Sequence, residues 1–210
     1  MPSTTSSCSW TGTSPGASRY TLAVPDHPNI IRGCPAGDPA DVELLCLDVD
    51  GVMTDGSIIL APDGGEQKRF HVRDGLAMKA WMRAGYRLAV ITGRGGPALR
   101  HRMTELGVEL VREHVADKGV AVREVQEGLG IQPARTAFMG DDLADLPAFA
   151  GSGYAMAPSD ADPDVLKRSD WIATRKGGDA AVREAIEHLL RSRGAWDDVV
   201  ARHLEAGNLA

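Results

Sequence analysis

The sequence predicts an α/β protein: a three-layer α/β/α domain with a parallel, Rossmann-like sheet and one inserted β-hairpin. Two observations support this. After Asp41, short apolar runs alternate with helical stretches at the spacing of strand–helix units. The first two runs, 43–50 and 86–92, are apolar on both faces, as strands covered by helices on both sides of a sheet are.

The other elements follow in chain order. Further strands are expected at 108–112, 136–140, 154–157 and 171–174. Helices are expected at 75–84, 97–106, 118–129, 143–150, 162–168, 179–193 and 195–206.

One segment interrupts the alternation. Residues 57–72 carry two strand-like arms around Pro62-Asp63-Gly64-Gly65, which predicts a β-hairpin inserted between the first strand and the first helix. Alternation in the second arm would place His71 and Arg73 on one face of the strand.

Composition excludes several classes of protein. The 210 residues carry 23 basic and 29 acidic side chains, a net charge of −6 without any basic run, so neither nucleic acid nor a membrane is an expected partner. No stretch approaches the roughly 20 apolar residues of a membrane span, and residues 1–18 lack the pattern of a secretory signal. Cys8, Cys34 and Cys46 form neither a disulfide framework nor a zinc pattern, so a cytoplasmic protein is expected.

The chain is expected to divide into two parts. Residues 1–38 are predicted to form a flexible or loosely packed extension, because 3–18 are rich in Ser and Thr and carry no charge. Residues 39–210 are long enough for one domain with its own core.

Acidic and hydroxyl side chains follow three of the predicted strands. Asp48 and Asp50 end the first strand, Thr92 the second, and Asp141 the fourth. In open α/β sheets, ligands bind outside the carboxyl ends of the strands. If strand geometry persists, Asp48 and Asp50 leave on the same side, and carboxylates this close require a cation. Mg²⁺ prefers such an oxygen donor set.

Lys118 is expected to belong to the same site. Asp117 is a good N-cap, which places Lys118 in the first turn of a helix, where the helix dipole disfavours a cation. An anionic partner would explain this position; a lysine that reaches away to water is the alternative. Asp141 or Asp142 could likewise serve only to cap the next helix.

Four motifs resemble those of the haloacid dehalogenase superfamily of phosphatases. The first is Asp48-Val49-Asp50-Gly51-Val52-Met53-Thr54-Asp55-Gly56, and the others, in order, are Thr92-Gly93-Arg94, Lys118 and Gly140-Asp141-Asp142-Leu143-Ala144-Asp145. A further stretch, Phe70-His71-Val72-Arg73-Asp74-Gly75, is similar to the subfamily of 3-deoxy-D-manno-octulosonate 8-phosphate phosphatase. The resemblance covers roughly residues 43–200 and implies that superfamily's fold.

The resemblance also implies a chemistry. Asp48 would attack phosphorus and form an aspartyl-phosphate, and Asp50 would protonate the leaving oxygen and then activate water. Mg²⁺ would be held by Asp48, the backbone carbonyl of Asp50, and Asp141. Thr92 and Lys118 would stabilise the transferring phosphoryl group.

Other positions match substrate contacts or supporting residues of the subfamily. Asp142 and Asp145 would lie behind the metal ligands, with Asp145 orienting Lys118 or metal-bound water. The substrate-binding positions implied are Asp50, His71, Val72, Arg73, Asp74, Gly75, Lys79, Arg94, Arg102 and Lys118. One departure is an acid, Asp179, where the subfamily typically has the Arg of Gly-Gly-Arg-Gly.

The expected function is therefore a Mg²⁺-dependent phosphatase acting on a phosphorylated acidic sugar, the 8-phosphate of an eight-carbon 3-deoxy-2-ulosonic acid. The alternatives are a phosphatase for a nine-carbon nonulosonate 9-phosphate, a receiver-like module that binds partners, and a catalytically weak oligomerisation domain of a cytidylyltransferase system. The resemblance implies no cap domain: larger relatives carry an inserted cap domain over the site, whereas here only the hairpin, 57–72, is inserted, and it is too short to close a site alone. A homo-oligomer, a tetramer by resemblance, is expected to supply the lid from neighbouring subunits.

Overall fold

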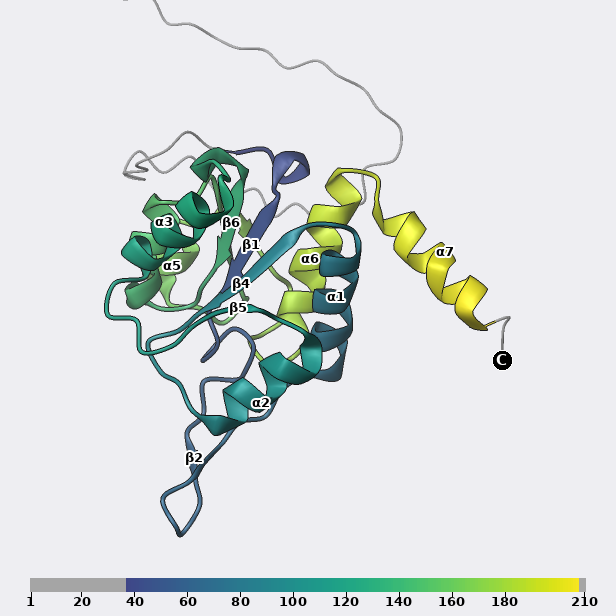
Figure 1. Ribbon diagram of the computed structural model, residues 1–210. Coiled ribbons are helices and arrows are strands. Elements are labelled where there is room, and N and C mark those ends of the chain that lie inside the picture. The colour runs from purple at the N-terminus through teal and green to yellow at the C-terminus, as the bar shows by residue number, and fades with distance from the viewer. Residues whose placement is uncertain (1–36, 208–210) are drawn as a thin grey trace, which may run out of the picture.

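The computed structural model describes residues 37–207, so the predicted extension lies outside the described residues as far as residue 36. A six-stranded sheet, parallel throughout, lies between two layers of helices (Figure 1). Its strand order is β5-β4-β1-β6-β7-β8, which confirms the predicted parallel, Rossmann-like sheet. The strands are β1 (Leu44–Leu47), β4 (Arg87–Ile91), β5 (Leu110–Arg112), β6 (Thr136–Met139), β7 (Tyr154–Ala157) and β8 (Trp171–Ile172).

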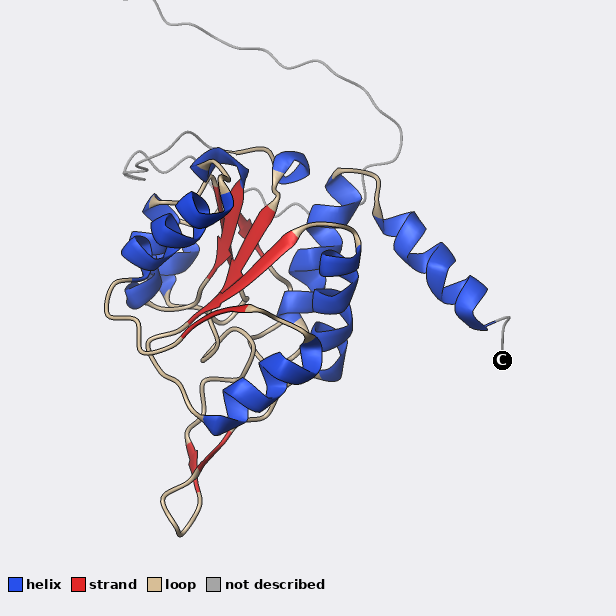
Figure 2. Ribbon diagram, viewed as in Figure 1, coloured by secondary structure: helices blue, strands red, loops and turns tan. Residues whose placement is uncertain are grey.

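The helices cover both faces of this sheet (Figure 2). α1 (Val72–Arg83) packs on α6 (Ala181–Ser192) over one face, and α3 (Lys118–Leu129) packs on α4 (Leu146–Ala150) over the other. The remaining helices are α2 (Pro97–Leu106), α5 (Pro163–Leu166), α7 (Trp196–Gly207) and the short 3-10 turns η1 (Pro39–Asp41), η2 (Pro133–Arg135) and η3 (Leu143–Asp145). No helix within residues 37–207 is long and apolar enough to cross a membrane.

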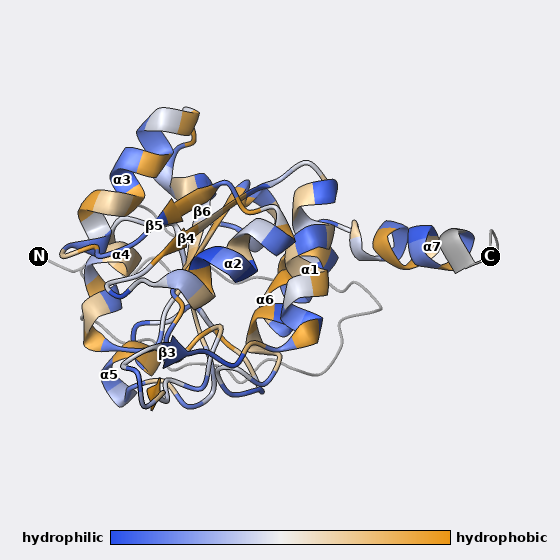
Figure 3. Ribbon diagram, turned by 60° about the horizontal axis from the view of Figure 1, so that its bottom comes forward, coloured by the Kyte–Doolittle hydropathy of each residue, from blue (hydrophilic) through white to orange (hydrophobic). Residues whose placement is uncertain are grey.

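The central strand β1 contributes to two separate cores. Leu45 and Leu47 belong to the core beneath α1 and α6, whereas Leu44 and Cys46 belong to the core beneath α3 and α4. All four side chains are fully buried, which confirms that this strand is covered on both faces. Figure 3 shows the hydrophobic residues gathered on the strands and on the inner sides of the helices.

Most predicted elements are confirmed, but the second arm of the hairpin is shorter than expected. Only β2 (Ile59–Leu60) and β3 (Glu66–Gln67) pair, and the chain then leaves the hairpin. α1 begins at Val72, with His71 as its N-cap, so the expected strand face shared by His71 and Arg73 is wrong. The physical reason is local: the ring nitrogen Nδ1 of His71 accepts a hydrogen bond from the backbone N–H of Arg73, which starts the helix there.

Two elements project from the domain. The hairpin extends beyond the carboxyl-end side of the sheet, and α7 leaves the body of the protein after the turn that follows α6 (Figure 1). Ile58, Ile59 and Leu60 of the hairpin are exposed, with Leu60 at 68%. A projecting element with exposed aliphatic side chains is typical of a contact surface.

Candidate active site

The carboxyl ends of β1 and β6 bring acidic side chains together. Asp48 follows β1 directly, and Asp141 follows β6 after one glycine. Because β1 and β6 pair in parallel, with Leu47 opposite Met139, the two aspartates lie at the same edge of the sheet. One oxygen each from Asp48, Asp141 and Asp145 lie within 4.8 Å of one another. We call these three residues the acidic cluster.

Lys118 lies inside the acidic cluster rather than in solvent. Its Nζ is 2.9 Å from Asp48 Oδ1 and 2.6 Å from Asp145 Oδ1, and its side chain is 7% exposed. Asp117 caps α3 as predicted, its carboxylate accepting a hydrogen bond from the backbone N–H of Val120. The anionic partner expected for Lys118 is therefore confirmed, and the alternative of a lysine in water is wrong.

The cluster holds more negative than positive charge. Burial, with Asp145 adding to it, raises the pKa of Asp48 to about 6, and burial with the charges of Asp145 and Asp48 raises that of Asp141 to about 8. Burial alone would lower the pKa of Lys118, but Asp48 and Asp145 outweigh it and raise that pKa. Lys118 thus stays an ammonium beside carboxylates that repel one another.

The donor set fits a hard divalent cation. Three carboxylates against one ammonium leave an excess of two negative charges when all are ionised. Asp141 Oδ1 is buried and accepts no hydrogen bond from any described residue. A Mg²⁺ ion would satisfy this oxygen and offset both the burial and the repulsion that raise the two pKa values.

A glycine makes room for this arrangement. Gly51 has φ of +88°, and a Cβ built on it would lie 1.9 Å from Asp141 Oδ2. A side chain at this position would therefore both strain the backbone and displace a cluster carboxylate. The residue after Asp50 must be glycine for Asp141 to approach the loop.

Asp145 fixes the loop after β6. Its Oδ2 accepts hydrogen bonds from the backbone N–H groups of Asp141, at 2.9 Å, and Asp142, at 3.2 Å. Its Oδ1 lies against Lys118, so one fully buried carboxylate links the two motifs. Asp142 is the N-cap of η3 and accepts from Leu143 N–H, so the capping alternative holds for Asp142. The supporting roles expected for both residues stay predictions.

Asp50 has different contacts from the residues of the acidic cluster. β1 ends at Leu47, and the N–H groups of Val52, Met53 and Thr54 all bond to the carbonyl of Val49, so the chain is already in a tight turn. Strand geometry does not persist as far as Asp50, so the condition for Asp48 and Asp50 to leave on the same side is not met. The Asp50 carboxylate instead contacts the ammonium of Lys68.

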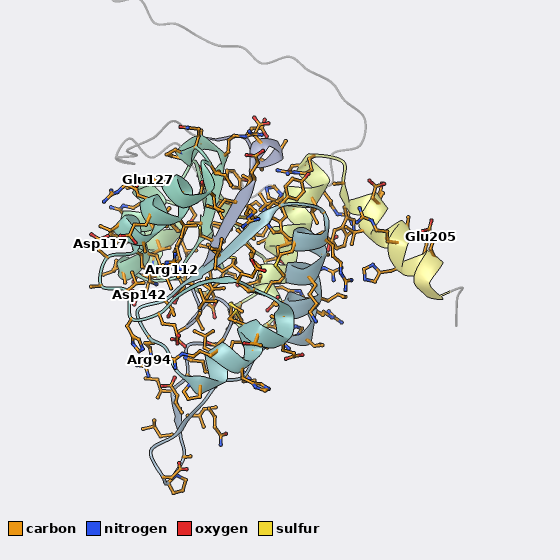
Figure 4. All side chains as sticks on the ribbon, in the orientation of Figure 1. Arg94, Arg112, Asp117, Glu127, Asp142 and Glu205 are labelled. Atoms are coloured by element: carbon orange, nitrogen blue, oxygen red, sulfur yellow. The ribbon has the colours of Figure 1, made fainter. Side chains whose placement is uncertain are left out.

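Charged residues of the hairpin meet Asp50. Lys68 Nζ is 3.0 Å from Glu66 Oε1, and Glu66 Oε2 accepts from Arg94, at 2.8 Å, while Arg94 Nε is 3.7 Å from Asp50 Oδ2. Figure 4 shows Arg94 near the base of the hairpin. Lys68 and Glu66 were not singled out from the sequence. Their spacing of two residues in the expected second arm, which predicts a shared face, is the signal that could have found them.

Thr92 directly follows β4 (Arg87–Ile91) beside the site. It is 2% exposed, and its Oγ1 accepts a hydrogen bond from the backbone N–H of Arg94 at 3.2 Å. The hydroxyl proton is thereby left to be donated to a ligand. The structure places Thr92 at the same sheet edge as Asp48, since β1 and β4 pair in parallel.

The predicted substrate-contact residues at the start of α1 divide into a solvent-accessible group, His71 to Arg73, and a buried group, Asp74 and Gly75. His71 lines a cavity of about 500 Å³ with Asp55, Lys176 and Asp179. Val72 is 77% exposed and Arg73 is exposed beside it, so these three residues are open to a ligand or to another subunit. Asp179 lines the same cavity, so a ligand bound there could contact both Asp179 and His71.

The next two residues are buried. Asp74 accepts a hydrogen bond from Arg183 N–H at the start of α6, at 2.7 Å, and burial raises its pKa to about 6. Gly75 packs so tightly that a Cβ would lie 2.4 Å from a guanidinium nitrogen of Arg102. The structure therefore gives Asp74 and Gly75 a packing role and does not bring them to the cavity.

Lys79 and Arg102 have an acidic partner of their own. Arg102 Nη1 donates to Glu105 at 2.8 Å, and this hydrogen bond, with the charges of Arg102 and Lys79, holds the pKa of Glu105 below its ordinary value. Both cations lie on the α1 and α2 side of the domain, and their contact with substrate stays a prediction.

Comparisons with known proteins agree with this geometry. A profile of the haloacid dehalogenase-like hydrolases matches residues 108–186. The chain is 34% identical over 183 residues to the 3-deoxy-D-manno-octulosonate 8-phosphate phosphatase of Salmonella typhimurium, covering 87% of this chain and 95% of that protein. It is 38% identical to the Haemophilus influenzae phosphatase of the same name, covering 73% and 86%.

A solved structure is similar in fold as well. The 3-deoxy-D-manno-octulosonate 8-phosphate phosphatase from Moraxella catarrhalis, in complex with a magnesium ion, a phosphate ion and KDO, superposes with a TM-score of 0.77. It is 35% identical in sequence, and the match covers 79% of this chain and 95% of that one.

Proposed function

This chain belongs to the 3-deoxy-D-manno-octulosonate 8-phosphate phosphatase family of haloacid dehalogenase-like hydrolases, and we propose that its substrate is the 8-phosphate of that eight-carbon sugar acid. The observation that carries the proposal is the meeting of Asp48, Lys118 and Asp141 at one sheet edge, in the order of the family's motifs. The relatives named above supply the substrate class.

In the proposed reaction Asp48 is the nucleophile. Its carboxylate would form a bond to phosphorus as the sugar oxygen leaves, and Asp50 would give a proton to that oxygen. Water, activated by Asp50, would then release phosphate. Lys118 would bind phosphoryl oxygens by its charge and Thr92 by its hydroxyl; the contact of Lys118 with Asp48 at 2.9 Å supports this role.

Mg²⁺ would be held by Asp48, Asp141 and the backbone carbonyl of Asp50. When bound, it supplies positive charge between carboxylate and phosphate. The unpartnered Oδ1 of Asp141 supports this assignment. Asp145 would hold Lys118 and the loop that carries Asp141.

A panel of sugar phosphates tests the substrate. Phosphate release is measured with Mg²⁺ and with EDTA, using the eight-carbon 3-deoxy-2-ulosonic acid 8-phosphate, a nonulosonate 9-phosphate and simple hexose phosphates. We expect kcat/KM to be highest for the eight-carbon acid and activity to disappear in EDTA. Equal, slow turnover of every substrate would contradict the specific proposal while leaving the phosphatase chemistry intact.

The nine-carbon acid remains the second candidate because of Asp179. Its carboxylate lines the cavity beside His71 and pairs only loosely with Arg175, at 3.8 Å. An acid there alters which polar groups of a sugar the cavity accepts. A preference for the nonulosonate in the same panel would select this alternative.

We also propose a homo-tetramer in which neighbouring subunits cover the site. The hairpin pairs only two residues on each arm, and Ile58, Ile59 and Leu60 are exposed on it. These aliphatic side chains are suited to burial against another copy. Light scattering on the active enzyme checks this; a fully active monomer would contradict it.

A further inference from the structure

We propose that Lys68 is a positioning residue for Asp50: its ammonium holds one oxygen of that carboxylate, so that the other oxygen faces the leaving group of the substrate. This inference rests on the proposed function, in which Asp50 protonates the leaving oxygen. It assigns a part in the chemistry to the hairpin.

The contacts of Asp50 are divided between its two oxygens. Oδ1 bonds to Lys68 Nζ. Oδ2 is buried and accepts no hydrogen bond from the described residues, with Arg94 Nε at 3.7 Å. A carboxyl that transfers a proton needs one oxygen free for the proton, and Oδ2 meets that requirement.

Lys68 is built to stay in place. Its side chain is only 4% exposed, and Glu66 Oε1 holds the ammonium from a second side at 3.0 Å. Burial alone would lower the pKa of Lys68, but the bonds to Asp50 and Glu66 outweigh it and raise that pKa. Arg94 in turn fixes Glu66 through a 2.8 Å bond. Ordering a lysine costs rotamer entropy, which the contacts with these two carboxylates offset.

The loop that carries Asp50 does not fix its side chain. Asp50 lies beyond the end of β1, and within the part of the chain that the structure describes its carboxylate has polar contacts with Lys68 and Arg94 alone. Proton transfer requires the acid within hydrogen-bond reach of the leaving oxygen, and a misplacement of about 1 Å can cost about 100-fold in rate. The Lys68 ammonium therefore determines the position of the Asp50 carboxyl group and of its proton.

The step affected is the first half-reaction. The Asp48 oxygen forms its bond to phosphorus, the bond between phosphorus and the leaving oxygen breaks with its electrons on that oxygen, and the Asp50 proton moves to it. Misplacing Asp50 slows this step most when the leaving oxygen is strongly basic. A good leaving group departs without the proton.

Two aryl phosphates separate this role from a substrate contact. kcat/KM, which includes leaving-group departure, is measured at saturating Mg²⁺ for phenyl phosphate and for p-nitrophenyl phosphate with the wild type and Lys68→Met. We expect Lys68→Met to lose about 30-fold or more on phenyl phosphate and about 3-fold or less on p-nitrophenyl phosphate. Lys68→Arg should restore most of the loss.

Asp50→Asn, measured in parallel, distinguishes the inference from its premise. If Asp50→Asn shows no selective loss on phenyl phosphate, the acid role in the proposed function fails. If it does, and Lys68→Met loses equally on both aryl phosphates or only on sugar phosphates, the positioning role is overturned. Lys167→Met, an exposed lysine paired with Asp164, is the matched control and should change neither rate.

Glu66→Gln provides a second variant that does not remove the buried ammonium. It weakens the second anchor of Lys68, so the same selectivity is expected at a smaller size, about 5-fold on phenyl phosphate. Thermal unfolding of each variant shows whether it is folded. An unselective rate for a folded Glu66→Gln, together with an unfolded Lys68→Met, would refute the proposal.

Discussion

Replacing Asp141 with asparagine should stabilise the metal-free protein and abolish its response to Mg²⁺. The folded-state pKa of Asp141 is about 8, raised by burial and by Asp145 and Asp48, whereas an unfolded aspartate titrates near pH ~4. Because the pKa of Asp141 is higher in the folded state than in the unfolded state, its contribution to the free energy of unfolding is fully present below about pH 4. That contribution is lost as the pH rises through 8. At pH 8 the ionising carboxyl opposes folding by at most about 5 kcal/mol.

Asparagine has nearly the same shape and carries no charge. The variant therefore keeps its contact with Gly51 and loses the repulsion inside the acidic cluster. Relaxation of the protein around buried charges reduces the effect, so we expect a gain of about 2 kcal/mol, or about 6 °C in Tm. Differential scanning calorimetry at pH 8 in EDTA measures it. Mg²⁺ should then raise the Tm of the wild type and leave the variant unchanged.

Asp164→Asn is the matched control. The Asp164 carboxylate is exposed and its pKa lies below the ordinary value because Arg168 donates to it, so neutralising it should give no gain. If Asp141→Asn unfolds at or below the wild-type temperature in EDTA, Asp141 is not under electrostatic strain, and the reasoning for a cation at the acidic cluster is refuted.

Three further changes probe the site and the fold. Asp48→Asn should lower phosphate release by about 10⁴-fold or more without loss of thermal stability, and retained turnover would exclude Asp48 as nucleophile. Lys118→Met leaves Asp48 and Asp145 buried without their cation, so urea unfolding should show a loss of about 3 kcal/mol in the metal-free protein, and an unchanged midpoint would argue against this pairing. Arg193→Ala removes a cation lying 4.1 Å from the Tyr86 ring centroid and a hydrogen bond to a backbone carbonyl, so it should cost about 2 kcal/mol with activity unchanged; a lower kcat at full stability would contradict a purely structural role.

Elements with strong local signals were predicted accurately. The spans expected at 97–106 and 118–129 are the observed bounds of α2 and α3. Each begins at a start signal, Pro97 or the N-cap Asp117, and ends before a glycine in the left-handed region. Where the start signal was unusual, as with His71 capping α1, the boundary was missed by three residues.

The acidic cluster could be anticipated because the carboxyl ends of parallel strands always meet at one edge. Asp48 and Asp141 follow parallel strands, and Lys118 begins a helix, so their meeting at this edge of the sheet follows from the fold class. The contact between Asp50 and Lys68 could not be anticipated, since it depends on a turn after β1 and joins residues that are 18 positions apart.

The sequence by itself determined the fold class, the strand ends that carry the chemistry and the family, because periodicity, caps and motifs are local properties of the chain. Only the tertiary structure decided which of the implied residues face a common site. In the folded protein Asp74 is buried and accepts a hydrogen bond from the start of α6, and Lys68 of the hairpin contacts Asp50. The physical reason is that burial and ion pairing act through space, between residues whose separation along the chain carries no signal of their contact.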